Sequence, residues 1–187
     1  MDADDYMTYE EFGRKFFEVA VTEDRVGGAI AAIAGDAFEM GPIGQGPGKI
    51  AKVTAKVRIM EPRITRQVGE MITFAIRIPL EIDMVVDLRI DRPKFMVFGE
   101  IALRATARAA APLLLILDVE KPRSSDISIH VTSKSLRAEV IRVLGGIDAE
   151  IRRFIAAHVS GEIDSPASKT AKIIDVADRL DAAWTGI

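Results

Sequence analysis

The sequence predicts an α+β protein in which a long bent antiparallel sheet wraps around a long amphipathic helix. Apolar residues recur every three or four positions near both ends of the chain, as in helices with one buried face. Between about residues 49 and 132 the period changes to two, as in strands with one buried face. The turns between these alternating segments are too short for crossover helices, so we expect neighbouring strands to be antiparallel.

Length and composition are those of one folded domain. The chain has 187 residues, of which 49% are hydrophobic and 28% are charged, and this is enough apolar material for a single core. We therefore expect one domain over residues 1–187. Within it, the predicted order is N-terminal helices at 8–35, the antiparallel sheet at 49–132, a long helix at 135–160 and a C-terminal helix at 166–185.

Charge and residue types argue against several classes of function. A net charge of -3 lacks the basic footprint that nucleic-acid binding needs, and the absence of cysteine excludes disulfides, thiolate nucleophiles and Cys-ligated metals. The longest apolar run, near Leu113–Leu117, is far shorter than the ~20 residues that span a bilayer. The acidic segment Met1–Tyr6 does not resemble a secretory signal. We therefore expect a cytoplasmic protein with no nucleic-acid partner.

Two short helices are predicted at the N-terminus. Thr8 and Glu11 have the spacing of a capping box, in which two side chains three positions apart satisfy each other's backbone N–H groups. The first helix should therefore run over about 9–20, with apolar residues at helical spacing: Phe12, Phe16, Val19 and Ala20. A second helix is predicted over 23–34, where Thr22 can cap its start and Gly35 can end it.

The glycine-rich segment Gly41–Gly48, next to Lys49, invites comparison with a phosphate-binding loop. Such a loop needs Ser or Thr directly after the lysine and a helix beyond it. Here Ile50 follows Lys49, and a strand pattern begins instead. We interpret the segment as a connector into the sheet.

The alternating segments predict about five or six antiparallel strands. The first places Val53, Ala55, Val57 and Ile59 on one face. The longest continues from Ile72 to Ile90 through Pro79 without losing phase, which predicts one very long strand or two strands that meet at a bend. Further strands are predicted over 95–105, 113–119 and 127–131; across Ala102–Ala111 we favour a strand over a helix.

The strongest helix signal follows the sheet. Its apolar stripe comprises Leu136, Val140, Val143, Leu144, Ile147, Ile151, Phe154, Ile155 and Val159. A last helix opens at Ser165–Pro166 and carries a stripe of Ile173, Ala177, Leu180 and Trp184. Because this stripe is too apolar to remain in water, the helix should dock on the sheet, cover a cavity mouth or pair with another chain, and we expect docking.

The polar residues form no pattern typical of catalysis. His130 and His158 have no metal-ligand spacing, and the Gly-x-Ser-x-Gly signature of a serine nucleophile is absent. The polar faces of two strands carry opposite charges and are predicted to lie side by side: Lys52, Lys56 and Arg58 against Glu81, Asp83 and Asp87. We predict no catalytic residue, no metal ligand and no cofactor.

The amount of apolar surface is the more unusual feature. A sheet with one continuous apolar face and a long amphipathic helix opposite it can together enclose an elongated cavity. The same surfaces can also pack solidly. The predicted lining is Ile72, Phe74, Ile76, Ile82, Met84, Val86, Val140, Leu144, Ile147, Ile151 and Phe154.

The order of elements resembles a known family. An N-terminal helix, long bent strands from Lys49 to Val131 and a long helix from Ser135 to Ser160 look like the tubular lipid-binding (TULIP) superfamily in its small bacterial form. The resemblance covers about Tyr9–Ile163 and implies a curled sheet around a long helix, with lipid or another apolar ligand held between them. Small bacterial members are exported, whereas this chain shows no export signal. The START-type helix-grip fold has a similar sheet and helix but begins with a strand, whereas two helices come first here.

We therefore expect a non-enzymatic carrier or sensor of a lipid or other apolar small molecule. This expectation admits peripheral contact with a membrane, and a homodimer. One alternative is a cofactor-free enzyme of the isomerase or cyclase type acting on a hydrophobic substrate, which a polar side chain such as Arg77 or Arg104 inside the cavity would favour. Another is a structural or oligomerising module, which a solid interior would favour.

Overall fold

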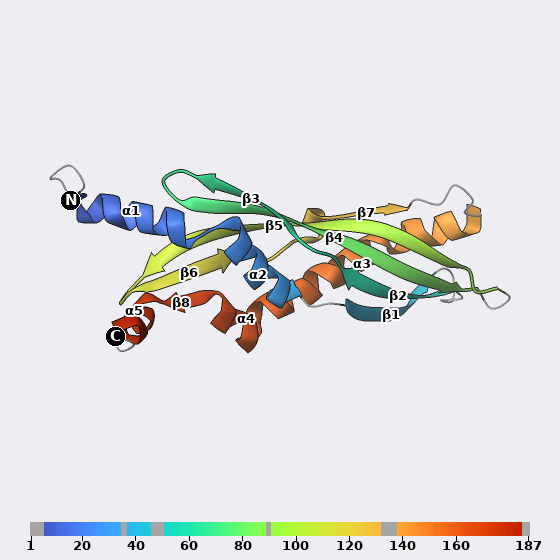
Figure 1. Cartoon of the computed structure of the whole chain (residues 1–187). Coiled ribbons are helices and arrows are strands. Elements are labelled where there is room, and N and C mark those ends of the chain that lie inside the picture. The colour runs from blue at the N-terminus through green and yellow to red at the C-terminus, as the bar shows by residue number, and fades with distance from the viewer. Residues whose placement is uncertain (1–5, 35–36, 46–50, 89–90, 132–137, 185–187) are drawn as a thin grey trace.

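Two very long neighbouring strands, β4 (Ile72–Asp87) and β5 (Lys94–Ala110), organise the fold of the computed structural model (Figure 1). The structure describes residues 6–34, 37–45, 51–88, 91–131 and 138–184, and the side chains of all of these except 32–34, 45, 131 and 138–144.

Each long strand is flanked on its other edge by two shorter strands placed end to end. β4 pairs with β3 (Arg63–Val68) along its first part and with β2 (Ala51–Ile59) along its second. β5 pairs with β7 (Ile127–Val131) and then with β6 (Leu114–Val119). The long central hairpin therefore carries most of the sheet.

Two further strands extend the sheet at its edges. β1 (Ala37–Gln45) pairs with β2, and β8 (Ile173–Asp175) pairs with β6. The eight strands within the described residues form one antiparallel sheet, strongly curled into a half-barrel. The α+β class and the antiparallel sheet are confirmed, while the strand number exceeds the predicted five or six because β1, β3 and β8 were not expected.

The alternation of apolar and polar residues along β4 matches the burial of its two faces. Every second residue from Ile72 to Val86 is buried, and the residues between them are exposed or half-buried. Pro79 interrupts neither the strand nor its phase, so of the two predicted alternatives it is the single very long strand that forms. Pro79 lies in the gap between the stretches of β4 that pair with β3 and with β2, where a missing N–H removes no ladder hydrogen bond.

The predicted connector at Gly41–Gly48 is wrong in its described part, because Gly41 to Gln45 belong to β1. The register of β1 on β2 shifts between Met40 and Ile43. Gly41 lies in this irregularity with a φ of +105°, and a Cβ there would lie 2.5 Å from the carbonyl oxygen of Val53. Glycine is therefore needed here for backbone geometry.

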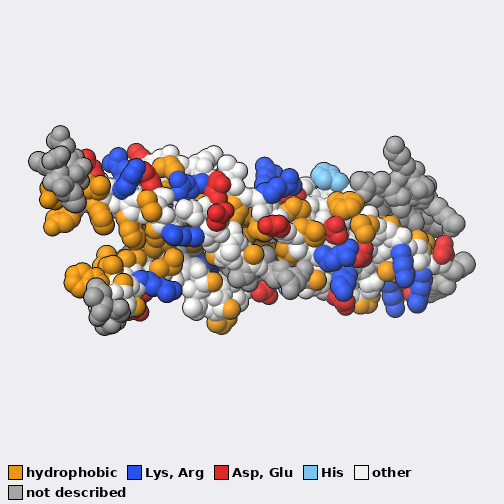
Figure 2. All heavy atoms as spheres, in the orientation of Figure 1, with side chains coloured by type: hydrophobic (Ala, Val, Ile, Leu, Met, Phe, Trp, Pro, Cys, Tyr) orange, Lys and Arg blue, Asp and Glu red, His pale blue; other side chains and the backbone are white. Residues whose placement is uncertain are grey.

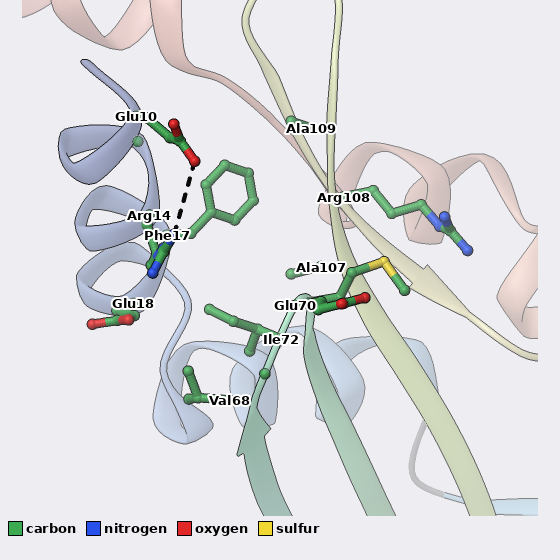
Figure 3. Close-up of a pocket in the computed structure, with 13 residues that line it drawn as sticks. Glu10, Arg14, Phe17, Glu18, Val68, Glu70, Ile72, Ala107, Arg108 and Ala109 are labelled. Carbon is green, nitrogen blue, oxygen red and sulfur yellow. Dashed lines mark ion pairs between the residues drawn. The ribbon is translucent and has the colours of Figure 1, made fainter. Parts of the chain in front are cut away.

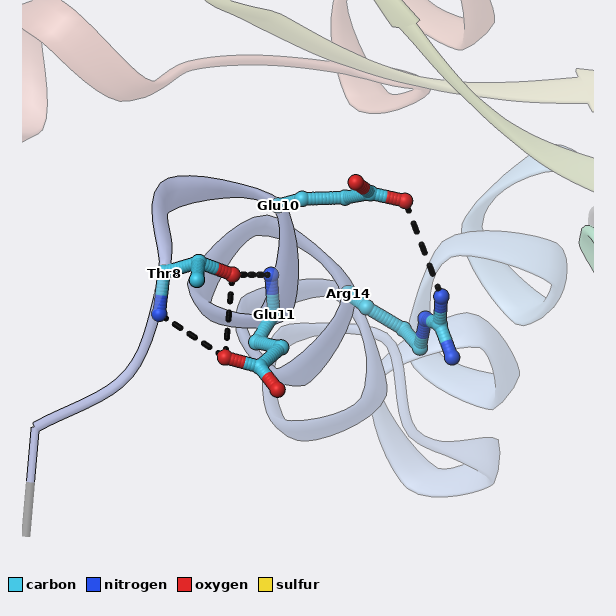
Figure 4. Close-up of polar contacts among 4 residues, drawn as sticks. All are labelled: Thr8, Glu10, Glu11 and Arg14. Atoms are coloured by element: carbon cyan, nitrogen blue, oxygen red, sulfur yellow. Dashed lines mark hydrogen bonds and ion pairs between the residues drawn. The ribbon is translucent and has the colours of Figure 1, made fainter. Parts of the chain in front are cut away.

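The two N-terminal helices match their predictions. They are α1 (Tyr9–Ala20) and α2 (Glu23–Ala34). The capping box forms as expected: the Thr8 hydroxyl oxygen accepts from the Glu11 N–H at 3.2 Å, and the Glu11 carboxylate accepts from the Thr8 N–H at 2.8 Å (Figure 4).

The long helix is α3 (Ala138–Asp164). Five of its buried residues are spaced four apart: Ile147, Ile151, Ile155, Val159 and Ile163. With the buried Ala156, they belong to the same core cluster as the strand residues. None of the helices in the described part of the chain is both long and apolar enough to cross a membrane.

The single predicted helix at 166–185 is wrong. The chain forms α4 (Pro166–Ala171), then β8, then α5 (Val176–Trp184). The β-branched pair at 173 and 174 pairs with the edge of β6, which provides ladder hydrogen bonds that a helix would forgo. The expected docking of the Trp184 stripe is also wrong, since α5 buries no residue and Trp184 is 79% exposed.

Candidate hydrophobic binding site

The predicted lining residues lie mostly in a packed core. The six residues of β4 are all buried, as are Ile147 and Ile151 of α3. The side chains of Val140 and Leu144 fall outside the described part of the chain. A void between the sheet and α3, with Ile78, Ile101 and Val159 in its wall, measures about 10 Å³. This is about the space of one water molecule and far below that of a lipid chain.

Phe154 does not lie where it was predicted. Its side chain is 41% exposed, because the buried stripe of α3 passes through the neighbouring Ile155. The Phe154 ring packs on Phe38 of β1, with 6.2 Å between ring centroids, and Phe38 also stacks on His158 at 3.8 Å. Phe154 therefore covers the edge of the core from outside.

A much larger space opens at the end of the molecule where both termini lie (Figure 1). It is a cleft of about 500 Å³ between α1, the turn from β3 to β4, and the last residues of β5. Figure 3 shows Phe17 projecting from α1 towards the strands, with Val68, Ile72 and Ala107 on the opposite wall. We call this space the α1 cleft.

The walls of the α1 cleft are apolar and its rim is charged. Its apolar residues are Phe17, Val68, Met71, Ile72, Ala107 and Ala109, and its charged residues are Glu10, Arg14, Glu18, Glu70 and Arg108. At the rim, Glu10 and Arg14 form a long ion pair of 3.9 Å, and Arg108 is held by Asp118 at 2.8 Å. Apolar walls with a few polar groups at the opening suit a hydrophobic or amphipathic ligand.

Helix α1 covers the cleft but is only lightly attached to the sheet. It buries no residue, and only Phe16, Phe17 and Ala20 pack partly against the core. An apolar helix face normally supplies most of a helix's stability by burial, so α1 has little of this support.

Two arginines hold the C-terminal end of α1. The Arg66 guanidinium on β3 donates to the carbonyls of Glu18 and Val21, each at 2.8 Å, and the Arg25 guanidinium donates to Ala20 at 2.8 Å. These carbonyls have no partner within the helix, so the arginines act as its C-terminal cap. The helix is thus fixed at this end.

The opposite end of α1 depends on the capping box. Hydrogen bonds from Thr8 to the Glu11 carboxylate hold the pKa of Glu11 below its usual value. Because these bonds require the ionised carboxylate, the start of α1 is sensitive to acid.

The outer face of the sheet carries a separate polar groove of about 780 Å³. Arg77, Arg104, Lys121 and Arg123 line it, and Arg77 and Arg104 project from the face opposite the buried row of β4 and β5. Lys121 binds Asp164 at the end of α3 at 2.6 Å, and this hydrogen bond lowers the pKa of Asp164. The polar side chains that would favour an enzyme therefore lie outside the apolar interior.

The charged faces of β2 and β4 lie side by side, as predicted. Lys52 pairs with Asp87, Lys56 with Asp83 and Arg58 with Glu81 along β2 and β4. The Arg58 guanidinium lies 3.0 Å from the Glu81 carboxylate and 3.2 Å from that of Asp83. These acids are thus part of a surface ion-pair network.

Neither histidine lies in a metal-binding arrangement. His130 is exposed on β7, and His158 stacks on Phe38. Within the described residues, no three His, Asp or Glu side chains form a group that could hold a metal ion.

Of the residues that line the α1 cleft, only Ile72 was predicted from the sequence. Phe17, Val68 and Met71 belong to three segments whose proximity depends on how the sheet curls, and local periodicity does not report it. No known family model matches the chain, and no curated protein is similar enough to count as a match.

Proposed function

We propose that the protein binds a lipid or similarly apolar small molecule in the α1 cleft. The observation that carries this proposal is an apolar space of about 500 Å³ at the open end of a half-barrel whose middle is filled by core side chains. The proposed site therefore lies beyond the end of α3, and only Ile72 is shared with the lining predicted from sequence.

The size and chemistry of the cleft support a hydrophobic ligand. Ligand pockets commonly measure roughly 300–1,000 Å³ and have mostly apolar walls. Burial of a ligand methylene group contributes about 0.8 kcal/mol, so an acyl chain can bind without any specific polar contact. Arg14 and Arg108 at the rim are placed to meet a polar head group near the opening.

Helix α1 acts as the cover of this site. Its C-terminal end is held by Arg66 and Arg25, while its first turns rest over the cleft without a buried side chain. A swing of the N-terminal half about the fixed end would open the cleft and leave the core intact.

We also propose that the curled sheet encloses α3 and that the chain is related to the TULIP superfamily. The order of two helices, a curled antiparallel sheet and a long helix supports both. The proposed ligand position at the open end does not depend on either.

A glycine substitution tests the site with a close control. Gly13 lines the cleft on α1, and a Cβ there would meet no atom within 4 Å. Gly13→Trp should fill the cleft without distorting the core and should weaken binding of the fluorescent fatty acid cis-parinaric acid at least about tenfold, a loss of ~1.4 kcal/mol. Gly161→Trp is the control, since Gly161 is also a helical glycine with open space around its Cβ but lies on α3.

The same proteins give a second readout. Organic extraction and mass spectrometry of the purified protein should recover an apolar molecule from the native chain and from Gly161→Trp, and less from Gly13→Trp. Equal binding of the probe by both variants would contradict the proposed site.

A further inference from the structure

The open end of the molecule exposes an unusual number of large apolar side chains. Figure 2 shows hydrophobic side chains gathered on both sides of the hollow at this end. Tyr9 is 96% exposed and Trp184 is 79% exposed. With them, the following side chains form what we call the apolar rim: Tyr9 and Phe12 of α1, Leu113 of the β5–β6 turn, Ile174 of β8, and Leu180 and Trp184 of α5.

The apolar rim is not explained by packing within the chain. Its residues come from four segments that are far apart in the sequence, and neither α1 nor α5 buries a residue. Single exposed apolar residues are ordinary, but a group of this kind at one end of a molecule marks a surface that contacts something else.

The composition of the apolar rim favours a lipid interface. Tyrosine and tryptophan combine an apolar ring with a polar group, and they are enriched where hydrocarbon meets water. Both lie near the tips of helices that flank the hollow, Tyr9 at the start of α1 and Trp184 at the end of α5.

The charges on the two helices of the apolar rim argue against attraction to an anionic surface. Helix α1 carries three acidic and two basic residues, and α5 carries two acidic residues and one basic residue. Each helix therefore has a formal charge of -1, which anionic lipids would repel weakly and zwitterionic lipids would not.

We propose that the apolar rim docks on the zwitterionic interface of a lipid bilayer. The shape of the rim distinguishes this partner from a second copy of the chain. Protein interfaces are packed as densely as protein interiors, whereas Figure 2 shows a hollow between the two sides of the rim. Fluid lipid chains can fill such a hollow. Docking goes beyond ligand binding and does not require the cleft to be occupied.

The chain has a single tryptophan, Trp184, so its fluorescence reports on the environment of the apolar rim. On addition of phosphatidylcholine vesicles, Trp184 emission should shift to the blue and should be quenched by brominated acyl chains. Because insertion is apolar, replacing part of the lipid with phosphatidylglycerol should not tighten binding, and added salt should not weaken it.

Two matched double variants leave the reporter in place. Tyr9→Ser with Phe12→Ser should weaken vesicle binding roughly tenfold or more, as expected for the loss of two inserting aromatic side chains. Met96→Ser with Phe98→Ser is the control, since these side chains are also exposed, at 42% and 40%, but lie on the first half of β5, away from the rim. Circular dichroism of each variant checks that the fold is retained.

The docking proposal is overturned if Trp184 emission does not respond to vesicles or if both double variants lose binding equally. It is also overturned if sedimentation shows a dimer in which Trp184 is already shielded without lipid, which would assign the rim to a second copy. Gly13→Trp separates the two proposals: it should lose cis-parinaric acid and keep vesicle binding. Failure of docking leaves the cis-parinaric acid result unaffected.

Discussion

Arg66 on β3 donates a hydrogen bond from its guanidinium to the carbonyl of Val21 across 2.8 Å, and this contact ties the end of α1 to the sheet. A second bond of the same length joins Arg66 to the carbonyl of Glu18. The contact matters because α1 has no fully buried side chain, and only Phe16, Phe17 and Ala20 pack partly against the core.

Removal of this arginine should loosen α1 and destabilise the protein. Arg66→Ala leaves two carbonyls without their charged donor, and we expect a loss of about 1–3 kcal/mol in the free energy of unfolding. Arg63→Ala is the control on the same strand. Its exposed ion pair with Glu100, at 3.5 Å, should be worth less than about 1 kcal/mol. Urea unfolding measures both changes, and similar losses for the two variants would contradict the role given to Arg66.

The start of α1 should respond to acid. Hydrogen bonds from Thr8 lower the pKa of Glu11 in the folded protein from its ordinary value of 4.5. A lowered folded-state pKa means that the stabilisation is complete above the unfolded value and is lost as the pH falls through the folded value. The protection factors of the α1 amides, which are corrected for the intrinsic exchange rate at each pH, should therefore fall below about pH 4.5, and the fall should be weaker in Glu11→Gln. An identical pH response in the two proteins would show that another group is responsible.

The position of the buried stripe on α3 can be tested by comparing substitutions at Ile151 and Phe154. Ile151 is buried, so Ile151→Ala should cost about 2–5 kcal/mol. Phe154→Ala should cost much less, because that ring is partly exposed and packs mainly on Phe38. A larger loss at Phe154 than at Ile151 in thermal or urea unfolding would place the stripe on the wrong face of the helix.

Alanine substitutions at two glycines should change the stability of the protein in opposite directions. At Gly99 a Cβ would lie 2.7 Å from the carbonyl oxygen of Ser128 on β7, so Gly99→Ala must displace one strand and destabilise the sheet. At Gly145 of α3 a Cβ would meet nothing within 4 Å. Gly145→Ala should stabilise the protein by roughly 0.5–1 kcal/mol through helix propensity. Melting temperatures that shift in the same direction in the two variants would contradict this pair of predictions.

The regular parts of the fold follow from local patterns. The alternation from Ile72 onward predicts β4, because one face of that strand is buried along its whole length. The capping box at Thr8 predicts the start of α1 because its hydrogen bonds are made within four residues. The proximity of β2 and β4 could be predicted from opposite charges on the two strands.

The missed elements depend on contacts between distant segments. β1 contains Gly41 and Pro42, which are unusual in strands, and it forms by pairing with β2 across a bulge. β8 has the spacing of a helix but pairs with the edge of β6. The α1 cleft combines Phe17, Met71 and Ala107 from three elements, and no local period identifies such a combination.

We propose that the apolar ligand binds in the α1 cleft and not between the sheet and α3. The most direct measurement is the broadening of backbone amide signals by a fatty acid that carries a nitroxide on its acyl chain. We predict strong broadening at Gly13, Ile72 and Ala107 and little at Ile82 and Ile151. Strong broadening at Ile82 and Ile151, or no broadening at the three cleft residues, would contradict the account.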